Sequence, residues 1–194
     1  VEKNARQFGP SKAVVFEGVE LNWSEFNAIS NRFANSFREQ GLVPGDTASV
    51  FMENRIEFLA TIIALNKLGI TAALINTNLT GRPLAHCISV TKSKKCIVGE
   101  ERLEHLSGIK DDLELKDGED FLVVKDQGEV AAPNWAIDLS QVAAQQDESN
   151  PPETVERTLG ETALYIFTSG TTGLPKAAIM TNRRYLSSAT HAEN

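Results

Sequence analysis

DTASVFMENRIEFLATIIALNKLGITAALI, residues 46–75, contains a strand, a helix and a second strand. Residues 46–52 form a short, mainly apolar run of the kind found in buried strands. Apolar side chains then fall on more than one side of a helix that starts near Ile56, which predicts that this helix is buried. Gly69 is a natural helix end, and residues 72–75 begin the next strand. A buried strand followed by a buried helix is the repeating unit of an α/β sheet.

The same alternation continues along the chain. Pro83 suits the first turn of a helix that runs to about Lys92, and residues 96–98 form a further strand. Strand, helix, strand, helix and strand thus follow one another at a spacing of about 25 residues. Strands that are joined by such crossovers pair in parallel. The expected fold class is therefore α/β, with a largely parallel sheet flanked by helices.

Polar residues predict where several of these elements begin. Ser24 is placed to cap a helix that runs to Gln40. Asn54, with Glu57 three residues later, predicts a capping box for the buried helix. Glu17-Gly18 lies between two short apolar segments and predicts a hairpin.

A polar segment at residues 145–152 ends in two prolines and is the best linker candidate in the chain. We therefore expect an N-terminal α/β subdomain at residues 1–150 and the start of the next subdomain at residues 151–194. The second part opens with an apolar strand that begins at Ala163.

That strand leads into YIFTSGTTGLPK, residues 165–176, which combines hydroxyls, glycines and one lysine. Hydroxyl groups can donate hydrogen bonds to anionic oxygens, and glycines let the backbone approach a ligand closely. Successive free N–H groups in such a turn form a concave anion site. The candidate nucleotide-binding residues are Thr168, Ser169, Gly170, Thr171, Thr172, Gly173 and Lys176.

This loop is not a Walker P-loop, whose pattern is G-x-x-x-x-G-K-[ST]. Pro175 precedes Lys176 and Ala177 follows it, so both diagnostic positions differ. Residues 177–180 also look like a second strand and not like the first turn of a helix. Phosphates would therefore be held by a loop between two strands, without a helix dipole behind them.

TSGTTGLPK, residues 168–176, resembles the AMP-binding signature of the adenylate-forming enzymes at all nine positions. The segments at residues 176–179, 76–79 and 84–87 are similar to the branch of fatty-acid transport proteins and very-long-chain acyl-CoA synthetases. Asn182 stands where that branch often has histidine. The resemblance spans roughly residues 8–190 and implies a partial N-terminal domain of an adenylate-forming enzyme.

The resemblance implies a long-chain fatty acid–CoA ligase. A fatty-acid carboxylate attacks the α-phosphate of ATP, which gives an acyl-adenylate and pyrophosphate, and the thiol of coenzyme A then displaces AMP. The loop hydroxyls and amides would hold the β- and γ-phosphates, with Lys176 as the catalytic residue and Mg2+ sharing the charge. The metal ligands are not identifiable. The alternatives are a ligase for a carnitine-type, aryl or medium-chain acid, and a non-catalytic nucleotide-binding homologue.

Other parts of the family's machinery lie downstream of this loop and cannot be located in the sequence. They include the adenine pocket, the ribose-binding aspartate, the hinge and the lysine of the C-terminal domain. The chain is therefore expected to be an N-terminal fragment of a longer enzyme and to be inactive alone. The start at Val1 leaves an upstream membrane anchor open.

Composition excludes several other classes of function. The net charge is −7 and the basic clusters are short, which disfavours a nucleic-acid partner. Cys87 and Cys96 lack metal-ligand spacing and lie in apolar patterns, so they are expected to be free, buried thiols in a reducing compartment. The expected location is cytoplasmic, with peripheral membrane association and a homodimer left open.

Other polar and aromatic residues receive plainer interpretations. None of the three histidines has the neighbours of a catalytic triad, and Trp23 and Trp135 are interpreted as packing anchors. Glu53 and Asn54 follow the carboxyl end of a strand, where α/β sheets bind ligands, but helix capping explains them more simply.

Overall fold

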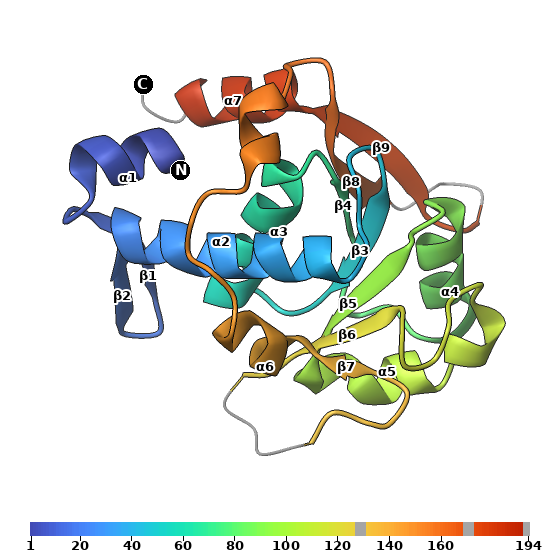
Figure 1. Cartoon of the computed structure of the whole chain (residues 1–194). Helices are drawn as coiled ribbons and strands as arrows, with labels where there is room; N and C mark the ends of the chain where they lie inside the picture. Colours follow the sequence, from blue (N-terminus) through green and yellow to red (C-terminus); the bar gives the residue numbers. More distant parts are fainter. Residues whose placement is uncertain (127–130, 169–172, 192–194) are drawn as a thin grey trace.

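The computed structural model describes residues 1–126, 131–168 and 173–191. In these ranges the main sheet has the strand order β7-β6-β5-β3-β4-β8-β9 (Figure 1). Its strands are β3 (Thr47–Phe51), β4 (Thr71–Leu74), β5 (Lys95–Gly99), β6 (Phe121–Val124), β7 (Ile137–Asp138), β8 (Thr162–Thr168) and β9 (Lys176–Thr181). Every neighbouring pair is parallel except β8 and β9, which are antiparallel. The α/β class and the largely parallel sheet are thus confirmed.

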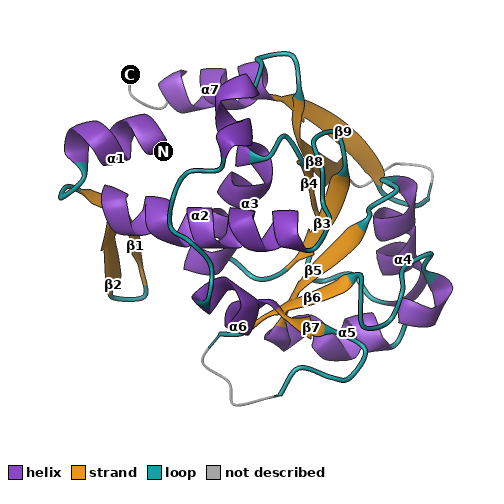
Figure 2. Cartoon of the chain, in the orientation of Figure 1, coloured by secondary structure: helices purple, strands orange, loops and turns teal. Residues whose placement is uncertain are grey.

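Helices cover both faces of the sheet (Figure 2). One core contains side chains from α2 (Trp23–Glu39), α3 (Ile56–Lys67) and α6 (Leu139–Ala144). The other contains side chains from α4 (Gly81–Val90) and α5 (Leu103–Ser107). Short 3-10 turns in the described ranges are Glu100–Arg102, Lys110–Asp112 and Pro152–Glu156.

Along β3 and β6, successive side chains alternate between these two cores. Val50 of β3 and Leu122 of β6 join the core beneath α2 and α3, whereas the adjacent Phe51 and Val123 join the core beneath α4 and α5. Successive side chains of a strand point to opposite faces, so a sheet that is covered on both faces needs apolar residues at every position. This requirement explains the continuous apolar runs of the sequence.

Local caps differ from two of the predictions. The cap of α2 is Asn22 and not Ser24, because Asn22 Oδ1 accepts from Glu25 N at 2.9 Å and Glu25 Oε2 accepts from Asn22 N at 2.8 Å. The predicted Asn54 capping box is also absent, since α3 begins after Arg55 and shows no side-chain cap hydrogen bond. The guanidinium of Arg55 instead donates to Glu101 and to the carbonyl of Val124, the last residue of β6.

The predicted hairpin is confirmed in the N-terminal part of the chain. Strands β1 (Lys12–Phe16) and β2 (Val19–Asn22) form a separate antiparallel pair. Glu17 and Gly18 both have positive φ, at 48° and 83°, as a two-residue type I′ turn requires. Helix α1 (Glu2–Phe8), which was not predicted from the sequence, lies beside α2.

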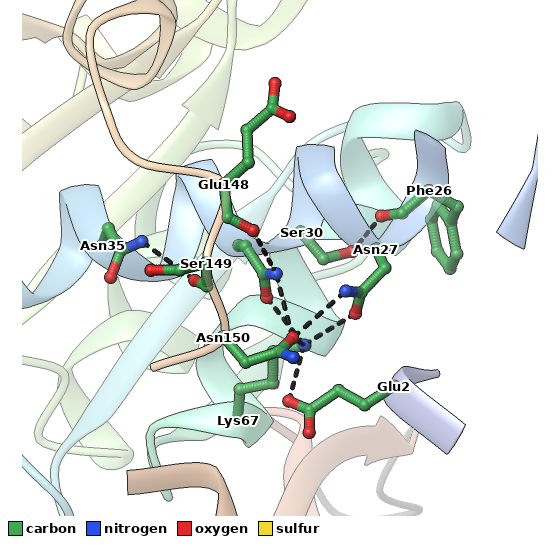
Figure 3. A network of polar contacts seen from close by, with 10 residues as sticks. Glu2, Phe26, Asn27, Ser30, Asn35, Lys67, Glu148, Ser149 and Asn150 are labelled. Carbon is green, nitrogen blue, oxygen red and sulfur yellow. Dashed lines mark hydrogen bonds and ion pairs between the residues drawn. The ribbon is translucent and has the colours of Figure 1, made fainter. Parts of the chain in front are cut away.

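A network of polar contacts surrounds Lys67, at the end of α3 (Figure 3). Lys67 Nζ donates to Glu2 Oε1 at 2.9 Å, Asn27 Oδ1 at 2.9 Å, Asn31 Oδ1 at 2.7 Å and Asn150 Oδ1 at 3.2 Å. Lys67 is only 5% exposed, and burial lowers its pKa, an effect that its hydrogen bond to Glu2 opposes. The network joins α1, α2 and α3 to residue 150.

Residues 147–150 are held along α2 and do not form a free linker. Asn35 Nδ2 donates to the carbonyl of Asp147 at 2.7 Å, and Asn31 Nδ2 donates to the carbonyl of Glu148 at 2.7 Å. Beyond this segment, β8 pairs with β4 and so enters the same sheet as the preceding strands. The division of the chain at residue 150 stays a prediction.

Two elements before that segment were also not predicted. They are β7, which is only two residues long, and α6. Asp138 caps α6 by accepting a hydrogen bond from Gln141 N at 3.1 Å, so this aspartate was the available local signal. In the part of the chain that is described, no helix is both long and apolar enough to span a membrane.

Candidate functional site

The candidate loop connects β8 and β9. The antiparallel pairing of β8 and β9 extends to Thr168, which lies opposite Lys176. The two ends of the loop are therefore adjacent residues of the sheet. β9 begins at Lys176, which confirms that a strand and not a helix follows the loop. Helix α7 (Asn182–His191) comes only after β9. The absence of a P-loop helix at this point agrees with the sequence, because Ala177 and Ala178 follow Lys176 in extended backbone.

Three of the predicted site residues lie in the described ranges. Thr168 and Lys176 are both exposed, and Gly173 is exposed with a φ of 134°, in the region that favours glycine. The other four, Ser169, Gly170, Thr171 and Thr172, lie outside the described residues. The roles assigned to the seven residues remain predictions.

The loop emerges at an edge of the sheet where ligands are expected. In the parallel pair of β4 and β8, Leu74 lies opposite Ile166, and Thr168 follows two residues further on. Thr168 therefore lies beyond the carboxyl end of β4. Open α/β sheets bind ligands outside the carboxyl ends of their strands. The position of the loop thus agrees with the chemistry of its residues.

A second position at this edge is occupied by the protein's own charges. The strand order reverses between β3 and β5, and such a switch point commonly holds a ligand. Here Arg55, which is 6% exposed, donates to Glu101 Oε2 at 2.7 Å and to the carbonyl of Val124 at 2.9 Å. Glu53 N donates to Glu101 Oε1 at 2.8 Å, and the Glu53 carboxylate pairs with Arg102. These charges neutralise one another, which leaves the loop after β8 as the stronger candidate.

Helix α4 contributes a contact to the loop that was not predicted from the sequence. His86 Nε2 lies 3.2 Å from the carbonyl oxygen of Pro175, the residue immediately before Lys176. Nothing local in the sequence links His86 to a loop 89 residues away. The one available signal is its place in residues 84–87, a segment that carries part of the family resemblance.

A hollow of the described surface lies away from this loop. It has a volume of about 840 Å³ and lies where β3, β5 and β6 begin, at the edge of the sheet opposite the loop. Its charged lining comprises Asp46, Lys92, Lys94, Lys95, Asp112, Glu114 and Asp120. Carboxylates and ammonium groups are mixed there, and Lys95 is already paired with Asp120 at 2.8 Å. This mixture points to no particular ligand class.

Metal and thiol chemistry find little support among the described residues. No group of three or more His, Cys, Asp or Glu side chains in these ranges could hold a metal ion. Cys87 and Cys96 are free and buried, as predicted. Burial raises the pKa of Cys87 to about 11 and that of Cys96 to about 12, so both thiols are neutral near pH 7.

The fold is that of an α/β domain with a candidate anion-binding loop after β8. A family model described as "AMP-binding enzyme" matches residues 1–193. The chain therefore belongs to the AMP-binding enzyme family, and the resemblance carried by residues 168–176 is confirmed.

Two curated relatives are similar to this chain over most of its length. The chain is 34% identical over 171 residues to long-chain fatty acid transport protein 1 of Mus musculus, covering 87% of this chain and 26% of the relative. It is 27% identical over 186 residues to the medium/long-chain-fatty-acid–CoA ligase FadD6 of Mycobacterium tuberculosis, covering 95% of this chain and 29% of that protein. The chain thus spans between a quarter and a third of the length of these curated relatives.

A solved structure shows the same fold. The anthranilate CoA ligase AuaEII, in complex with anthranoyl-AMP, matches 97% of this chain and 35% of its own chain with a TM-score of 0.87. Sequence identity to it is 20%, so this likeness concerns the fold alone.

Proposed function

We propose that this chain provides the phosphate-binding part of a long-chain fatty acid–CoA ligase. The observation that carries the proposal is the loop from Thr168 to Lys176, closed by an antiparallel strand pair at the carboxyl edge of a parallel sheet. Its nine residues match the signature of a family to which the chain belongs. An exposed lysine and hydroxyl at the mouth of the loop suit a polyanionic ligand.

The reaction has two halves in this proposal. A fatty-acid carboxylate oxygen attacks the α-phosphorus of ATP, the bond from that phosphorus to the bridging oxygen breaks, and pyrophosphate leaves. The thiol of coenzyme A then attacks the acyl carbon, loses its proton and displaces AMP. Such transfers depend chiefly on positioning and on neutralisation of charge. The chain's own residues would supply both for the departing pyrophosphate.

Each loop residue has a specific task in this scheme. Hydroxyl and amide groups of Thr168, Ser169, Gly170, Thr171, Thr172 and Gly173 would donate hydrogen bonds to the β- and γ-phosphates. Lys176 would offset the charge of the leaving pyrophosphate. Mg2+ is implied as the companion of ATP, but the described residues include no group that fits a metal ion. None of the tasks assigned to this chain depends on that ion.

Long fatty acids are the proposed substrates because of the curated relatives. The 34% identity to a long-chain fatty acid transport protein supports this class more strongly than the 20% identity to an anthranilate CoA ligase supports an aryl acid. We also propose a cytoplasmic enzyme that associates peripherally with a membrane, which suits a substrate that partitions into lipid. Because the chain spans about a quarter of its first relative, we expect no turnover by the 194 residues alone.

The decisive experiment is acid-dependent ATP–pyrophosphate exchange by the full-length gene product, with acids from acetate to very long fatty acids. Lys176→Ala is expected to lower the exchange by about 100-fold or more, since it removes a charge that acts on the leaving group. Lys12→Ala is the matched control, because Lys12 is an exposed lysine in the separate hairpin, paired with Glu20.

Each outcome has a distinct meaning. Exchange that peaks with long acids and collapses only in Lys176→Ala supports both the substrate and the loop. Exchange that peaks with an aryl or medium-chain acid would support the proposed reaction but contradict long fatty acids as its substrates. No exchange with any acid, from a folded protein, would contradict the ligase and favour a non-catalytic nucleotide-binding homologue.

A further inference from the structure

The contact between His86 and Pro175 joins a helix to the exit of the candidate loop. The two atoms are His86 Nε2 and the Pro175 carbonyl oxygen, at 3.2 Å. A carbonyl oxygen can only accept, so the hydrogen must be on Nε2. Both the neutral Nε2–H tautomer and the imidazolium carry that hydrogen. The contact therefore requires a ring that carries its hydrogen on Nε2.

The accepting carbonyl occupies a special position in the chain. Proline holds its own φ near −65°, so ψ is the remaining soft dihedral of Pro175. The direction of its carbonyl reports that ψ and sets the plane of the peptide that leads to Lys176. Lys176 is the first residue of β9 and lies opposite Thr168. A hydrogen bond to this carbonyl thus controls the direction in which the backbone enters Lys176.

Helix α4 is a firm support for such a contact. Its residues Leu84, Cys87 and Ile88 are buried in the core on that face of the sheet, whereas His86 is only partly buried. In Figure 1, α4 lies next to the start of β9, at the carboxyl edge of the sheet. The helix cannot follow a shift of the loop without disturbing this core, because buried side chains are closely packed.

We propose that His86 is a positioning residue that holds the Pro175–Lys176 peptide in place, and through it the Lys176 ammonium and the exit of the phosphate loop. This inference rests on the proposed function for its catalytic consequence, but the contact itself is independent of it. His86 touches neither of the reacting groups in this proposal. Its effect would be on ATP and pyrophosphate and not on the fatty acid or on coenzyme A.

Two variants separate the hydrogen bond from the volume of the side chain. His86→Leu removes the hydrogen-bond donor but still places a side chain of substantial volume at this position. His86→Gln retains an N–H donor of similar reach. Val90→Ala is the control for a change on the same helix, since Val90 is 51% exposed. Thermal unfolding of all variants shows whether the fold is intact.

The first measurement is hydrogen–deuterium exchange of the full-length protein without substrate, followed in peptides that contain Gly173, Leu174 and Lys176. We expect about fivefold faster exchange in His86→Leu, the factor that a hydrogen bond of ordinary net strength contributes. His86→Gln and Val90→Ala should match the wild type. Equal exchange in His86→Leu and wild type, or equally fast exchange in His86→Gln and His86→Leu, would overturn the positioning role.

The second measurement is the kinetics of the same proteins. In His86→Leu we expect kcat/KM for ATP in pyrophosphate exchange to fall by about five- to tenfold, with KM for the acid unchanged. The rate of acyl transfer from preformed acyl-adenylate to coenzyme A should not change in His86→Leu. In His86→Gln, ATP–pyrophosphate exchange should return to the wild-type rate. A uniform loss in both half-reactions that tracks a lower Tm would mean a structural role only and would overturn the inference.

The two measurements also separate this inference from the proposed function. If the wild type exchanges no pyrophosphate with any acid, the proposed function fails, and deuterium exchange still decides whether His86 holds the loop. If the wild type is active and His86→Leu is indistinguishable from it in both measurements, only the positioning role fails.

Discussion

Two lysines of this chain occupy opposite environments. Lys67 is 5% exposed and donates to four side-chain oxygens from α1, α2 and the segment around residue 150. Lys176 is exposed at the mouth of the β8–β9 loop, and its ammonium makes no hydrogen bond or ion pair with the described residues. Removal of a buried lysine whose donors are all used leaves its partners unpaired, whereas a lysine with open donors is available to a ligand.

The largest expected effect on stability comes from Lys67. We expect Lys67→Met to lower the free energy of unfolding by about 3 kcal/mol, because the buried Asn31 Oδ1 and the largely buried Glu2 carboxylate lose their donor. Urea unfolding of the chain, followed by tryptophan fluorescence, measures this. A loss below about 0.5 kcal/mol would contradict the contrast between the two lysines, since exposed sites usually give values of that size.

Gly69 and Gly41 both have positive φ, but only Gly69 has neighbouring atoms where a Cβ would lie. Gly69 has a φ of 71°, and a Cβ there would collide with the Arg157 guanidinium. Gly41 has a φ of 84° with no atom near the same position. Both alanine variants incur the cost of positive φ, about 1 kcal/mol, and Gly69→Ala should cost about 1 kcal/mol more because Arg157 is displaced.

The Arg157 contribution can be measured by a double-mutant cycle. In an Arg157→Ala background the extra cost of Gly69→Ala should vanish, so that it equals that of Gly41→Ala. Chemical denaturation of the four proteins gives the coupling free energy. An unchanged difference would show that Arg157 moves aside freely and that the tight packing at Gly69 has no energetic weight.

The buried thiols predict a smaller, pH-dependent effect. Burial raises the pKa of Cys96 to about 12, above its unfolded value, so its contribution is complete below about pH 9 and is lost as the pH rises towards 12. Between these two pH values the Cys96 thiol is ionised in the unfolded state but still protonated in the folded state. The wild-type free energy of unfolding should therefore fall more steeply with rising pH than that of Cys96→Ala.

Unfolding curves at pH 8, 9 and 10 test this difference in slope. Lys67 acts in the opposite direction, because its lowered pKa makes stability rise as the pH passes from the folded to the unfolded value. Comparison with Cys96→Ala removes that contribution, since both proteins retain Lys67. Parallel curves for the two proteins would mean that the Cys96 thiol is not protected from ionisation.

The smallest expected effect on stability belongs to Lys176. Lys176→Ala should change the free energy of unfolding by less than about 0.5 kcal/mol, although it abolishes most pyrophosphate exchange in the proposed function. The two measurements on one variant separate a ligand-binding lysine from a structural one. A loss of stability comparable to that of Lys67→Met would place both lysines in the same structural class.

Local chemistry was sufficient for the sheet and for the candidate loop. Residues 46–98 alternate between apolar strands and amphipathic or buried helices, and those strands and helices formed where they were expected. Pro175 and Ala177 excluded a Walker loop from sequence alone, and β9 begins between them at Lys176. These features depend on residues that are neighbours in the chain, so their pattern carries the information.

Tertiary structure decided the features whose partners are distant in the sequence. Asn54 satisfied the pattern of a cap, but Arg55 is bound to Glu101 and Val124, and α3 begins after it. Residues 145–152 have the composition of a linker, but Asn150 accepts a hydrogen bond from Asn31, which lies 119 positions earlier in the chain. Hydrogen bonds of this kind leave no periodic signal, since burial and orientation, and not local propensity, create them.

The contact between His86 and Pro175 belongs to the same category. A histidine on a partly apolar helix and a proline in a glycine-rich loop carry no mutual signal across 89 positions. Only the packing of α4 against the carboxyl edge of the sheet brings the imidazole to the carbonyl. Residue types along the chain thus determined which loop is the candidate for phosphate binding, whereas three-dimensional packing decided which side chain contacts its exit, because a hydrogen bond requires two groups to meet in space.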